Sequence, residues 1–350
     1  MVSHQILEWG KPLETREYPT PEPTGSQVLL KVDACGVCHS DLHIREGFFD
    51  MGGGQKRRLA DQGVVLPLTP GHEPVGTVAA VGPDADGVRE GDARVVWPWV
   101  GCRKCRACLR HEDIFCERGR YLGARVDGGF SDYMMIPDAR YLLDYRGVDP
   151  PIAATYACAG ITAYAALKRG LDGLKSGDVL LIIGAGGLGM SALQIVQAMT
   201  EATIVVADRD ADKRALAERV AGVRTVDNTA PNAAEDLKRE TGSVAATVDF
   251  VGAEATTTFG IDSLRRGGTH VIVGLFGGAL TLPIPIYIYK LLRLQGSHVG
   301  TPQDLQELLD LRRAGSIAPP PISTRPMGEA ELAMQDLEAG KVEGRTVLVN

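Results

Sequence analysis

An apolar run, a glycine-rich turn and a helical pattern follow one another in the second half of this chain. The run 179–183 is typical of a strand buried on both faces, as in a parallel sheet. It leads into Gly184-Ala185-Gly186-Gly187-Leu188-Gly189, and residues 190–199 then carry a helical apolar pattern. These glycines let the backbone approach a pyrophosphate, and the helix N-terminus supplies free N–H groups. In this context the motif predicts a dinucleotide-binding turn.

A second predicted strand, 203–207, ends at Asp208, 19 residues beyond Gly189. An acidic side chain there accepts hydrogen bonds from ribose hydroxyls and repels a 2′-phosphate, so NAD is favoured over NADP. The neighbouring Arg209 argues the other way, but its position is not fixed by the strand end. Further strand-like runs at 246–252 and 268–274 complete a predicted doubly wound, Rossmann-type α/β domain over residues 160–296.

Length and charge narrow the possibilities for the rest of the chain. A chain of 350 residues exceeds one hydrophobic core, so two domains are expected. A net charge of −7 gives no electrostatic footprint for nucleic acid, and no apolar run could span a membrane. The seven cysteines, four of them in one run, favour metal over disulfides. We therefore expect a cytoplasmic protein with no nucleic-acid or membrane partner.

Metal-ligating side chains are dense at 35–43, which reads Cys-Gly-Val-Cys-His-Ser-Asp-Leu-His, and at 71–73, which reads Gly-His-Glu. Zn²⁺ takes thiolate and imidazole together, and a catalytic zinc keeps three protein ligands and one open position. Cys38 and His72 are the first two candidates, with a third ligand still to come from further along. The plain alternative for Cys38 is a buried free thiol in a loop. The strand-like run 27–34 would place the cluster at a strand end.

The most specific motif is a run of four cysteines with x2, x2 and x7 spacing: Cys102, Cys105, Cys108 and Cys116. Four thiolates this close can surround one zinc and leave no open position, which predicts a structural site. The charged residues between them are typical of a solvent-exposed lobe, about 101–117. Chance free cysteines rarely take this spacing in a cytosolic chain.

Together the motifs resemble those of the zinc-dependent alcohol dehydrogenases of the medium-chain dehydrogenase/reductase family. The resemblance covers essentially the whole chain, including Tyr-Ala-Cys-Ala-Gly-Ile-Thr at 156–162 and Gly-Arg-Thr-Val-Leu at 344–348. It implies a β-rich GroES-like catalytic domain over 1–159 and 297–350, carrying the cysteine lobe, with the Rossmann domain between. It also implies NAD, two Zn²⁺ ions, and hydride transfer between an alcohol and NAD⁺ with Lewis-acid help.

The resemblance supplies roles that spacing alone does not. Cys158 matches the third ligand of the catalytic zinc; without the family it would be taken for a small core thiol. Ser40 matches the hydroxyl that takes the substrate proton, and His43 matches the base that passes it on. Asp41 and Glu73 match residues that lie beside the metal ligands. Three residues match cofactor contacts: His39, Lys213 and Arg345. Trp97 and Trp99 match residues of the pocket wall.

Two departures from the family bear on the substrate. Many relatives carry threonine at the position of Ser40, so the pocket here is roomier. The segment 48–66 is longer than in compact members, and its aromatic and basic start, from Phe48 to Arg58, is a candidate substrate loop or a solvated surface insertion. Both departures favour a substrate bulkier than ethanol.

Two alternatives stay open. A polyol dehydrogenase of the same superfamily is disfavoured because that branch tends to replace the Cys158-type ligand with a carboxylate. A zinc- and NAD-binding protein without turnover would not require the Ser40 and His43 pair. Family members without a long extra loop in the lobe are often tetramers. The resemblance therefore favours a homotetramer over a dimer.

Overall fold

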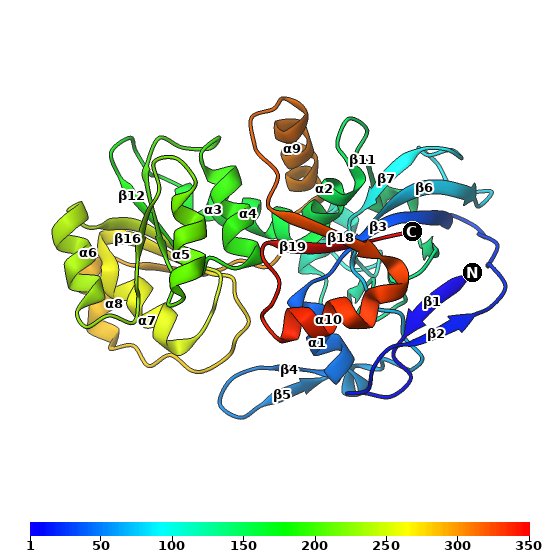
Figure 1. Cartoon of the computed structure of the whole chain (residues 1–350), viewed down its shortest axis with the longest axis horizontal. Coiled ribbons are helices and arrows are strands. Elements are labelled where there is room, and N and C mark those ends of the chain that lie inside the picture. Colours follow the sequence, from blue (N-terminus) through cyan, green and yellow to red (C-terminus); the bar gives the residue numbers. More distant parts are fainter.

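The computed structural model describes residues 1–350 and contains two sheet-based parts that lie side by side (Figure 1). The left part in that view, green to yellow, is built on a parallel sheet; the right part joins blue, cyan and red segments around an antiparallel one. One buried cluster of 56 residues runs through both, from Val28 and Val347 to Leu180 and Val271. This shared core fixes the two parts against each other. No helix is long and apolar enough to cross a membrane.

The parallel sheet has the strand order β14-β13-β12-β15-β16-β17. This is the doubly wound order in which the chain reverses direction across the sheet between its first and fourth strands, β12 and β15. The two central strands are wholly buried, as predicted for 179–183, whereas the last edge strand is exposed. The bounds are β12 (Val179–Ile183), β13 (Thr203–Ala207), β14 (Arg224–Val226), β15 (Val244–Asp249), β16 (Leu264–Ile272) and β17 (Arg293–Gly296).

Helices alternate with these strands, and the first begins within the glycine turn. Asp210 caps one of them, because its side chain accepts hydrogen bonds from the N–H groups of Asp212 and Lys213. The predicted helix at 190–199 begins three residues earlier and ends three residues earlier. The bounds are α4 (Gly187–Val196), α5 (Ala211–Glu218), α6 (Ala233–Thr241), α7 (Glu254–Ser263) and α8 (Ile284–Lys290).

The second large sheet has seven strands and draws on both ends of the chain. Its order is β11-β7-β6-β3-β19-β18, with β10 also paired to β3. The C-terminal β19 lies antiparallel to β3, and Val347 pairs with Gly36. The bounds are β3 (Val28–Gly36), β6 (Glu73–Val81), β7 (Ala93–Val96), β10 (Tyr133–Ile136), β11 (Leu142–Asp144), β18 (Ile322–Pro326) and β19 (Arg345–Val349).

A continuous helical stretch, residues 150–171, leads from this sheet to the parallel one. It consists of α2 (Pro150–Thr155), the π-helical η5 (Tyr156–Gly160) and α3 (Ile161–Leu171). The other helices are α1 (His39–Glu46), α9 (Pro302–Arg313) and α10 (Ala330–Glu338), with 3-10 turns η1 (Ala60–Gln62), η2 (Cys108–Arg110), η3 (Asp113–Phe115), η4 (Ala139–Tyr141) and η6 (Met327–Glu329).

Three small two-stranded sheets complete the fold: β1 (Val2–Gln5) with β2 (Glu14–Glu17), β4 (Phe48–Asp50) with β5 (Lys56–Arg58), and β8 (Trp99–Val100) with β9 (Arg120–Tyr121). The segment 48–66, expected as a loop, therefore starts with a hairpin that projects from the lower edge of the molecule (Figure 1). Its tip reaches the other part, because a Cβ on Gly52 would lie 2.0 Å from the carbonyl oxygen of Gly278.

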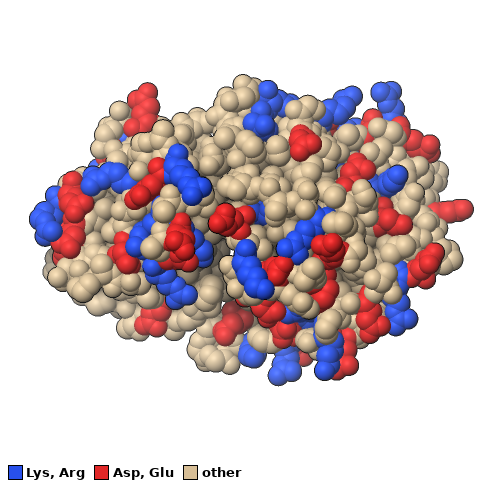
Figure 2. Space-filling view, viewed as in Figure 1, with Lys and Arg blue, Asp and Glu red and all other residues tan.

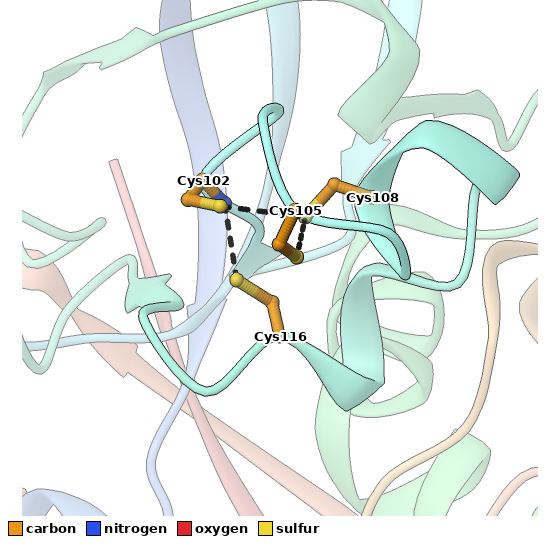
Figure 3. A group of neighbouring side chains, drawn as sticks. All are labelled: Cys102, Cys105, Cys108 and Cys116. Atoms are coloured by element: carbon orange, nitrogen blue, oxygen red, sulfur yellow. Dashed lines mark hydrogen bonds between the residues drawn. The ribbon is translucent and has the colours of Figure 1, made fainter.

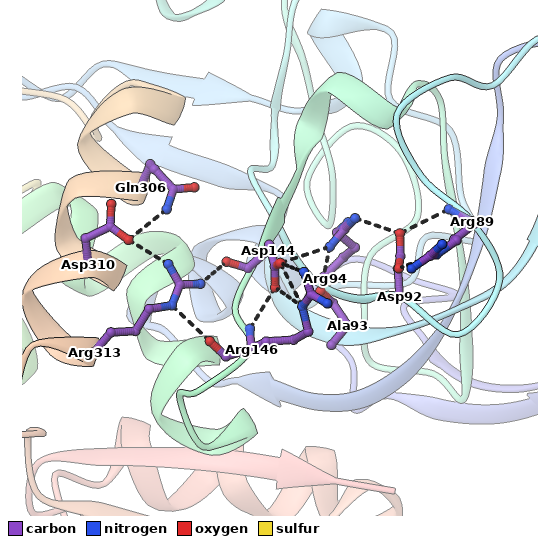
Figure 4. A network of polar contacts seen from close by, with 9 residues as sticks. All are labelled: Arg89, Asp92, Ala93, Arg94, Asp144, Arg146, Gln306, Asp310 and Arg313. Carbon is purple, nitrogen blue, oxygen red and sulfur yellow. Dashed lines mark hydrogen bonds and ion pairs between the residues drawn. The ribbon is translucent and has the colours of Figure 1, made fainter.

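A polar network holds α9 against the seven-stranded sheet (Figure 4). Arg313 donates from Nε to the carbonyl oxygen of Arg146 at 2.9 Å and from Nη1 to Asp310 at 2.6 Å. Arg94 pairs with Asp92 at 2.7 Å. Arg313 and Asp310 are solvent-exposed, so their pair contributes at most about 1 kcal/mol, whereas Arg94 and Asp92 are half-buried. The network orients α9 more than it stabilises the fold.

Candidate active site and metal centres

The candidate catalytic cluster begins where β3 ends. Cys38 is the N-cap of α1, and its own N–H donates to Asp41 Oδ2 at 2.9 Å. The same carboxylate accepts the Gly71 N–H at 3.2 Å on Oδ1. Asp41 is fully buried, so it holds the loops of both predicted ligands, Cys38 and His72, in one place.

Asp41 also orients the imidazole of His72. Nδ1 of His72 lies 3.0 Å from Asp41 Oδ1, which places the Nδ1 proton toward the carboxylate and leaves Nε2 free to bind a metal. Burial opposes protonation of this ring, but the charge and hydrogen bond of Asp41, together with Cys38, outweigh burial and raise the pKa of His72 well above its ordinary value. The second-shell role expected of Asp41 agrees with this geometry.

Cys158 reaches the cluster from the π-helical turn η5. Such turns are rare and occur often at functional sites, because the extra residue displaces one side chain from the regular helical face. Ligand atoms of Cys38, His72, Glu73 and Cys158 all lie within 4.8 Å of one another, and all four residues are buried. The structure thus brings the three predicted ligands together from three separate segments.

Glu73 and Arg345 form a buried ion pair at the edge of the cluster. Burial raises the pKa of Glu73 to about 7 although Arg345 favours its charged form. Burial disfavours the charge on Arg345, but Glu73 and Cys38 raise its pKa above its ordinary value. The second carboxylate oxygen of Glu73 is buried without a hydrogen-bond partner. That oxygen is available to a metal.

The two thiols of the cluster differ in acidity. A hydrogen bond from Cys158 is the main reason that the pKa of Cys38 falls well below its ordinary value, with His72 adding to the effect against burial. The same bond, together with burial, raises the pKa of Cys158. Cys38 is therefore the readier thiolate, and thiolate is the form that binds metal.

The glycine turn after β12 has the geometry that a dinucleotide requires. Gly184 has a φ of +94°, which favours glycine, and a Cβ on Gly189 would lie 1.7 Å from the Gly184 carbonyl oxygen. A Cβ on Gly186 would meet nothing within 4 Å, so the backbone there is open to a ligand. Near Gly187 the closest atom is Cδ of Arg345, at 3.1 Å from an ideal Cβ. Arg345 thus lies between the glycine turn and Glu73.

The other predicted cofactor residues surround this turn. Asp208 Oδ2 accepts the Ala185 N–H at 2.7 Å, so the carboxylate stands at the turn where an adenosine ribose would bind. Arg209 and Lys213 are exposed beyond the end of β13, and His39 is exposed at the first residue of α1.

Ser40 and His43 share one face of α1 because they are three residues apart, and both are half-buried. Burial lowers the pKa of His43. Its ring lies 5.3 Å from that of Phe49 on β4. Phe48, the residue singled out from sequence, lies on the opposite face of the hairpin under Lys56, at 3.8 Å. Phe49 was not singled out from the sequence. The alternation of side chains along a strand could have identified it, because adjacent strand residues point to opposite faces and only one of the two phenylalanines can face His43.

Trp97 and Trp99 occupy different environments. Trp97 is buried, stacks on Tyr141 and donates from Nε1 to the Gly300 carbonyl oxygen at 3.0 Å. Trp99 is half-buried and packs edge-on against Tyr121 at 4.6 Å and His298 at 4.9 Å. Tyr121 and His298 were not identified from sequence, because no motif connects residues so far apart in the chain.

The four-cysteine lobe forms a second cluster (Figure 3). All four sulfur atoms lie within 4.8 Å of one another. The Cys105 and Cys108 sulfurs are 3.5 Å apart, and the Cys102 N–H donates to the Cys116 sulfur at 3.3 Å. Backbone N–H groups lower the pKa of Cys102 to about 6, whereas burial raises that of Cys108 to about 12.

Comparisons with known proteins agree with this geometry. Residues 24–145 match the family described as the alcohol dehydrogenase GroES-like domain, and residues 187–313 match the zinc-binding dehydrogenases. An NAD-dependent alcohol dehydrogenase of Sulfurisphaera tokodaii is 35% identical over 352 residues, covering 100% of both chains. The chain belongs to the zinc-type alcohol dehydrogenases of the medium-chain family.

Solved structures of this family have the same fold. The alcohol dehydrogenase of Aeropyrum pernix superposes with a TM-score of 0.88 at 31% identity, covering 100% of both chains. The D-arabinose dehydrogenase of Sulfolobus solfataricus gives a TM-score of 0.84 at 26% identity, covering 100% of this chain and 99% of that one. A GroES-like part joined to a Rossmann-type part is therefore the fold of this zinc-type dehydrogenase, as the sequence predicted.

The residues present fit zinc at both clusters. Two thiols and an imidazole, with a carboxylate oxygen that lacks a partner, are a donor set that Zn²⁺ accepts. Four thiols alone leave no position for water or substrate, whereas the mixed cluster offers three ligands of the family's type.

Proposed function

We propose that this protein oxidises primary or secondary alcohols with NAD⁺ and reduces the matching aldehydes or ketones. One observation carries the proposal: Cys38, His72 and Cys158 converge in a buried cluster that Arg345 joins to the glycine turn. A metal site and a dinucleotide turn that share one arginine are placed for chemistry between a metal-held substrate and a nicotinamide. Full-length likeness to an NAD-dependent alcohol dehydrogenase supports the same conclusion.

Each residue has a part in this proposal. Cys38, His72 and Cys158 hold the catalytic Zn²⁺, which when bound supplies Lewis-acid activation of an alcohol or carbonyl oxygen. Glu73 lies beside the metal and tunes its coordination. Ser40 accepts the substrate proton at Oγ, and His43 receives it at a ring nitrogen, because burial keeps that ring neutral near pH 7. Cys102, Cys105, Cys108 and Cys116 hold a second, structural Zn²⁺.

The cofactor contacts are proposed on the same ground. The glycine turn and the start of α4 receive the pyrophosphate, with Arg345 and His39 beside it. Asp208 accepts the ribose hydroxyls, with Lys213 and Arg209 at its edge. We expect Asp208→Ala to relax the preference for NAD⁺ over NADP⁺ at least tenfold, because the repulsion of a 2′-phosphate is removed. A variant that rejects NADP⁺ as strongly as the parent would show that Asp208 is not the selector.

The direct test of the function is initial-rate NAD⁺ reduction with short, branched, long-chain and benzylic alcohols. A sample treated with a chelator is measured alongside. We expect turnover that is lost with zinc, and a preference for substrates larger than ethanol. If no alcohol or polyol reacts while NADH still binds, the non-catalytic alternative is correct.

A polyol dehydrogenase is the second candidate, and the fold shared with a D-arabinose dehydrogenase supports it. Cys158 weighs against it, because that branch tends to carry a carboxylate in its place. Sorbitol and D-arabinose in the substrate panel separate the two candidates, since only a polyol enzyme would prefer them to 1-alkanols.

We also propose a homo-oligomer, a tetramer in preference to a dimer. Strand β17 is exposed along its whole length at the edge of the parallel sheet, which leaves its outer hydrogen-bonding groups free. Beside it α8 exposes apolar side chains, among them Ile284, Ile288 and Tyr289. A second copy could pair edge to edge with β17 about a two-fold axis and cover them. Light scattering would give the mass.

Two further expectations remain proposals. The domain limits 1–159 with 297–350 and 160–296 are supported by β19 pairing with β3 across the chain ends. A cytoplasmic location is supported by all seven cysteines being free thiols.

A further inference from the structure

Positive side chains without acidic partners gather beside the candidate active site. Arg57 and Arg125, together with the neutral imidazole of His298, stand around Trp99 and Tyr121, and we refer to these five residues as the cationic wall. In Figure 2, acidic and basic side chains are mixed over the visible face, and basic ones project at the lower edge where the β4–β5 hairpin lies. The chain has a net charge of −7, so cationic side chains without acidic partners beside a reaction centre indicate a binding site for an anion.

The hairpin register puts Arg57 on the active-site side. Phe49 and Arg57 are paired directly across the two strands, so their side chains share one face. Phe49 on that face lies 5.3 Å, ring to ring, from His43. Phe48 and Arg58 form the neighbouring pair and share the opposite face. Arg57 is thus the cross-strand neighbour of Phe49, the residue whose ring lies near His43 of the proposed proton relay.

Contacts connect the hairpin to the rest of the wall. Gln62, in the turn after β5, donates to the Arg58 carbonyl oxygen at 3.3 Å and accepts a hydrogen bond from Arg125. Arg125 lies over the Tyr121 ring at 5.3 Å. Tyr121 packs on Trp99, which packs on His298. Contacts therefore run without a break from the hairpin backbone at Arg58 to His298, and Arg57 is close enough for its charge to act on both Arg125 and His298.

The backbone holds His298 firmly in its place. Val299 has a φ of +53°, a left-handed conformation that β-branched residues rarely adopt. The next residue, Gly300, is fixed by the hydrogen bond from Trp97 Nε1, and a Cβ on it would lie 2.7 Å from Ile161. Surroundings that maintain such a conformation fix the direction of the neighbouring side chain, and strain of this kind is concentrated at functional sites.

No carboxylate neutralises the wall. Arg57 and Arg125 form no salt bridge, and the two hydrogen bonds of Arg125 go to the neutral Gly119 and Gln62. Burial lowers the pKa of Arg125 and of His298, and in both the charge of Arg57 adds to the effect. Nε1 of Trp99 is buried without a hydrogen-bond partner. The wall thus offers two guanidinium charges that no carboxylate neutralises, and an indole N–H with no acceptor in the chain.

We propose that the substrate is an alcohol with a carboxylate at the end remote from the hydroxyl, and that Arg57 and Arg125 bind this carboxylate. Planar guanidinium groups match a carboxylate in shape and charge. Phe49 and Trp99 would cover the carbon chain between the two ends. The inference rests on the proposed function and names its substrate class. The alcohol carbon loses two electrons, NAD⁺ is reduced to NADH, one proton is released, and the carboxylate is unchanged.

The test compares ω-hydroxycarboxylates with 1-alkanols of equal chain length by kcat/KM. We expect the parent to favour the hydroxy acid about tenfold, as one charge-assisted hydrogen bond allows. Arg57→Gln should abolish this preference by raising the KM of the hydroxy acids. Arg58→Gln, the matched control on the opposite hairpin face, should keep it. An unchanged preference in Arg57→Gln, or equal efficiencies for both substrate series in the parent, would overturn the proposal.

A binding measurement separates this proposal from the proposed function. Calorimetric titration with hexanoate needs no turnover, and we expect binding that weakens with added salt and about tenfold in Arg57→Gln and in Arg125→Lys. If hexanoate binds equally well to the parent and to Arg57→Gln, the proposed carboxylate site is wrong, even if the protein oxidises alkanols. Hexanoate that needs Arg57, in a protein that oxidises no alcohol, supports the carboxylate site and refutes the dehydrogenase.

Discussion

The two cysteine clusters differ in how the chain builds them. The lobe takes all four ligands from the single segment 102–116, near the surface, with sulfur as the only donor. The proposed catalytic cluster takes Cys38, His72 and Cys158 from three segments, buries all of them, and mixes nitrogen with sulfur. A cluster within one segment can form locally, whereas the other exists only when the whole fold has formed. The first is therefore suited to stability and the second to chemistry.

The largest expected effect comes from Cys158→Ser. Loss of a thiolate ligand from the three-ligand cluster should lower kcat/KM by about a thousandfold, because metal activation contributes several kcal/mol. Metal analysis should show one zinc per chain in place of two, and the melting temperature should stay within a few degrees. A variant that keeps both zinc ions and its activity would remove Cys158 from the catalytic cluster and revive the polyol alternative.

Asp41→Asn should have an intermediate effect on the same cluster. The amide keeps only one of the two acceptor oxygens, so it cannot accept both the Cys38 and Gly71 N–H groups, and it no longer carries the charge that fixes the tautomer of His72. Zinc affinity should therefore fall about 10- to 100-fold. Zinc at the four-cysteine lobe should be retained. Competition with a chromophoric chelator measures both affinities. Equal weakening of both sites would mean that Asp41 supports the fold rather than the metal.

Cys105→Ser tests the other side of the comparison. We expect loss of the lobe zinc, a melting temperature lower by several degrees, and a kcat within about twofold of the parent in the protein that stays folded. Calorimetry and metal analysis provide the two readouts. An unaltered melting temperature with full metal content would show that this cluster is not structural.

The smallest effect concerns His270, which separates acid sensitivity of the fold from loss of metal. Burial in the parallel sheet lowers its pKa to about 4, from 6.5 in an unfolded chain. Between pH 4 and 6.5, His270 is therefore protonated in the unfolded state and neutral in the folded state. Stability is complete above about pH 6.5 and falls by up to about 3 kcal/mol as the pH drops to 4.

Metal-free protein serves for this measurement, because zinc bound at either proposed site would also be released in acid. Urea unfolding of the parent and of His270→Gln at pH 4.5 and 7 gives, for each protein, the slope of the unfolding free energy against pH. The parent should lose more stability between these pH values than the variant. Parallel slopes would show that His270 contributes nothing to acid sensitivity.

What could be predicted from the sequence follows from the same contrast. The strands at 179–183 and 203–207 and the four-cysteine motif are local patterns, and they were confirmed as elements or as a cluster. Cys158 could be assigned only through the family, because nothing in its neighbourhood marks it. The ordered hairpin at Phe48–Arg58, the contact of Phe49 with His43, and the approach of His298 to Trp99 depend on packing between distant segments. No local pattern encodes such packing.

Progressive chelation with parallel readouts tests the central claim most directly. Zinc content, NAD⁺ reduction with a good alcohol substrate, and melting temperature are followed in the same samples. We predict that activity falls in proportion to one of two zinc equivalents and returns when zinc is restored, while the melting temperature follows the other. Activity that survives removal of both equivalents, or that is lost only as the fold melts, would contradict the division into a catalytic and a structural cluster.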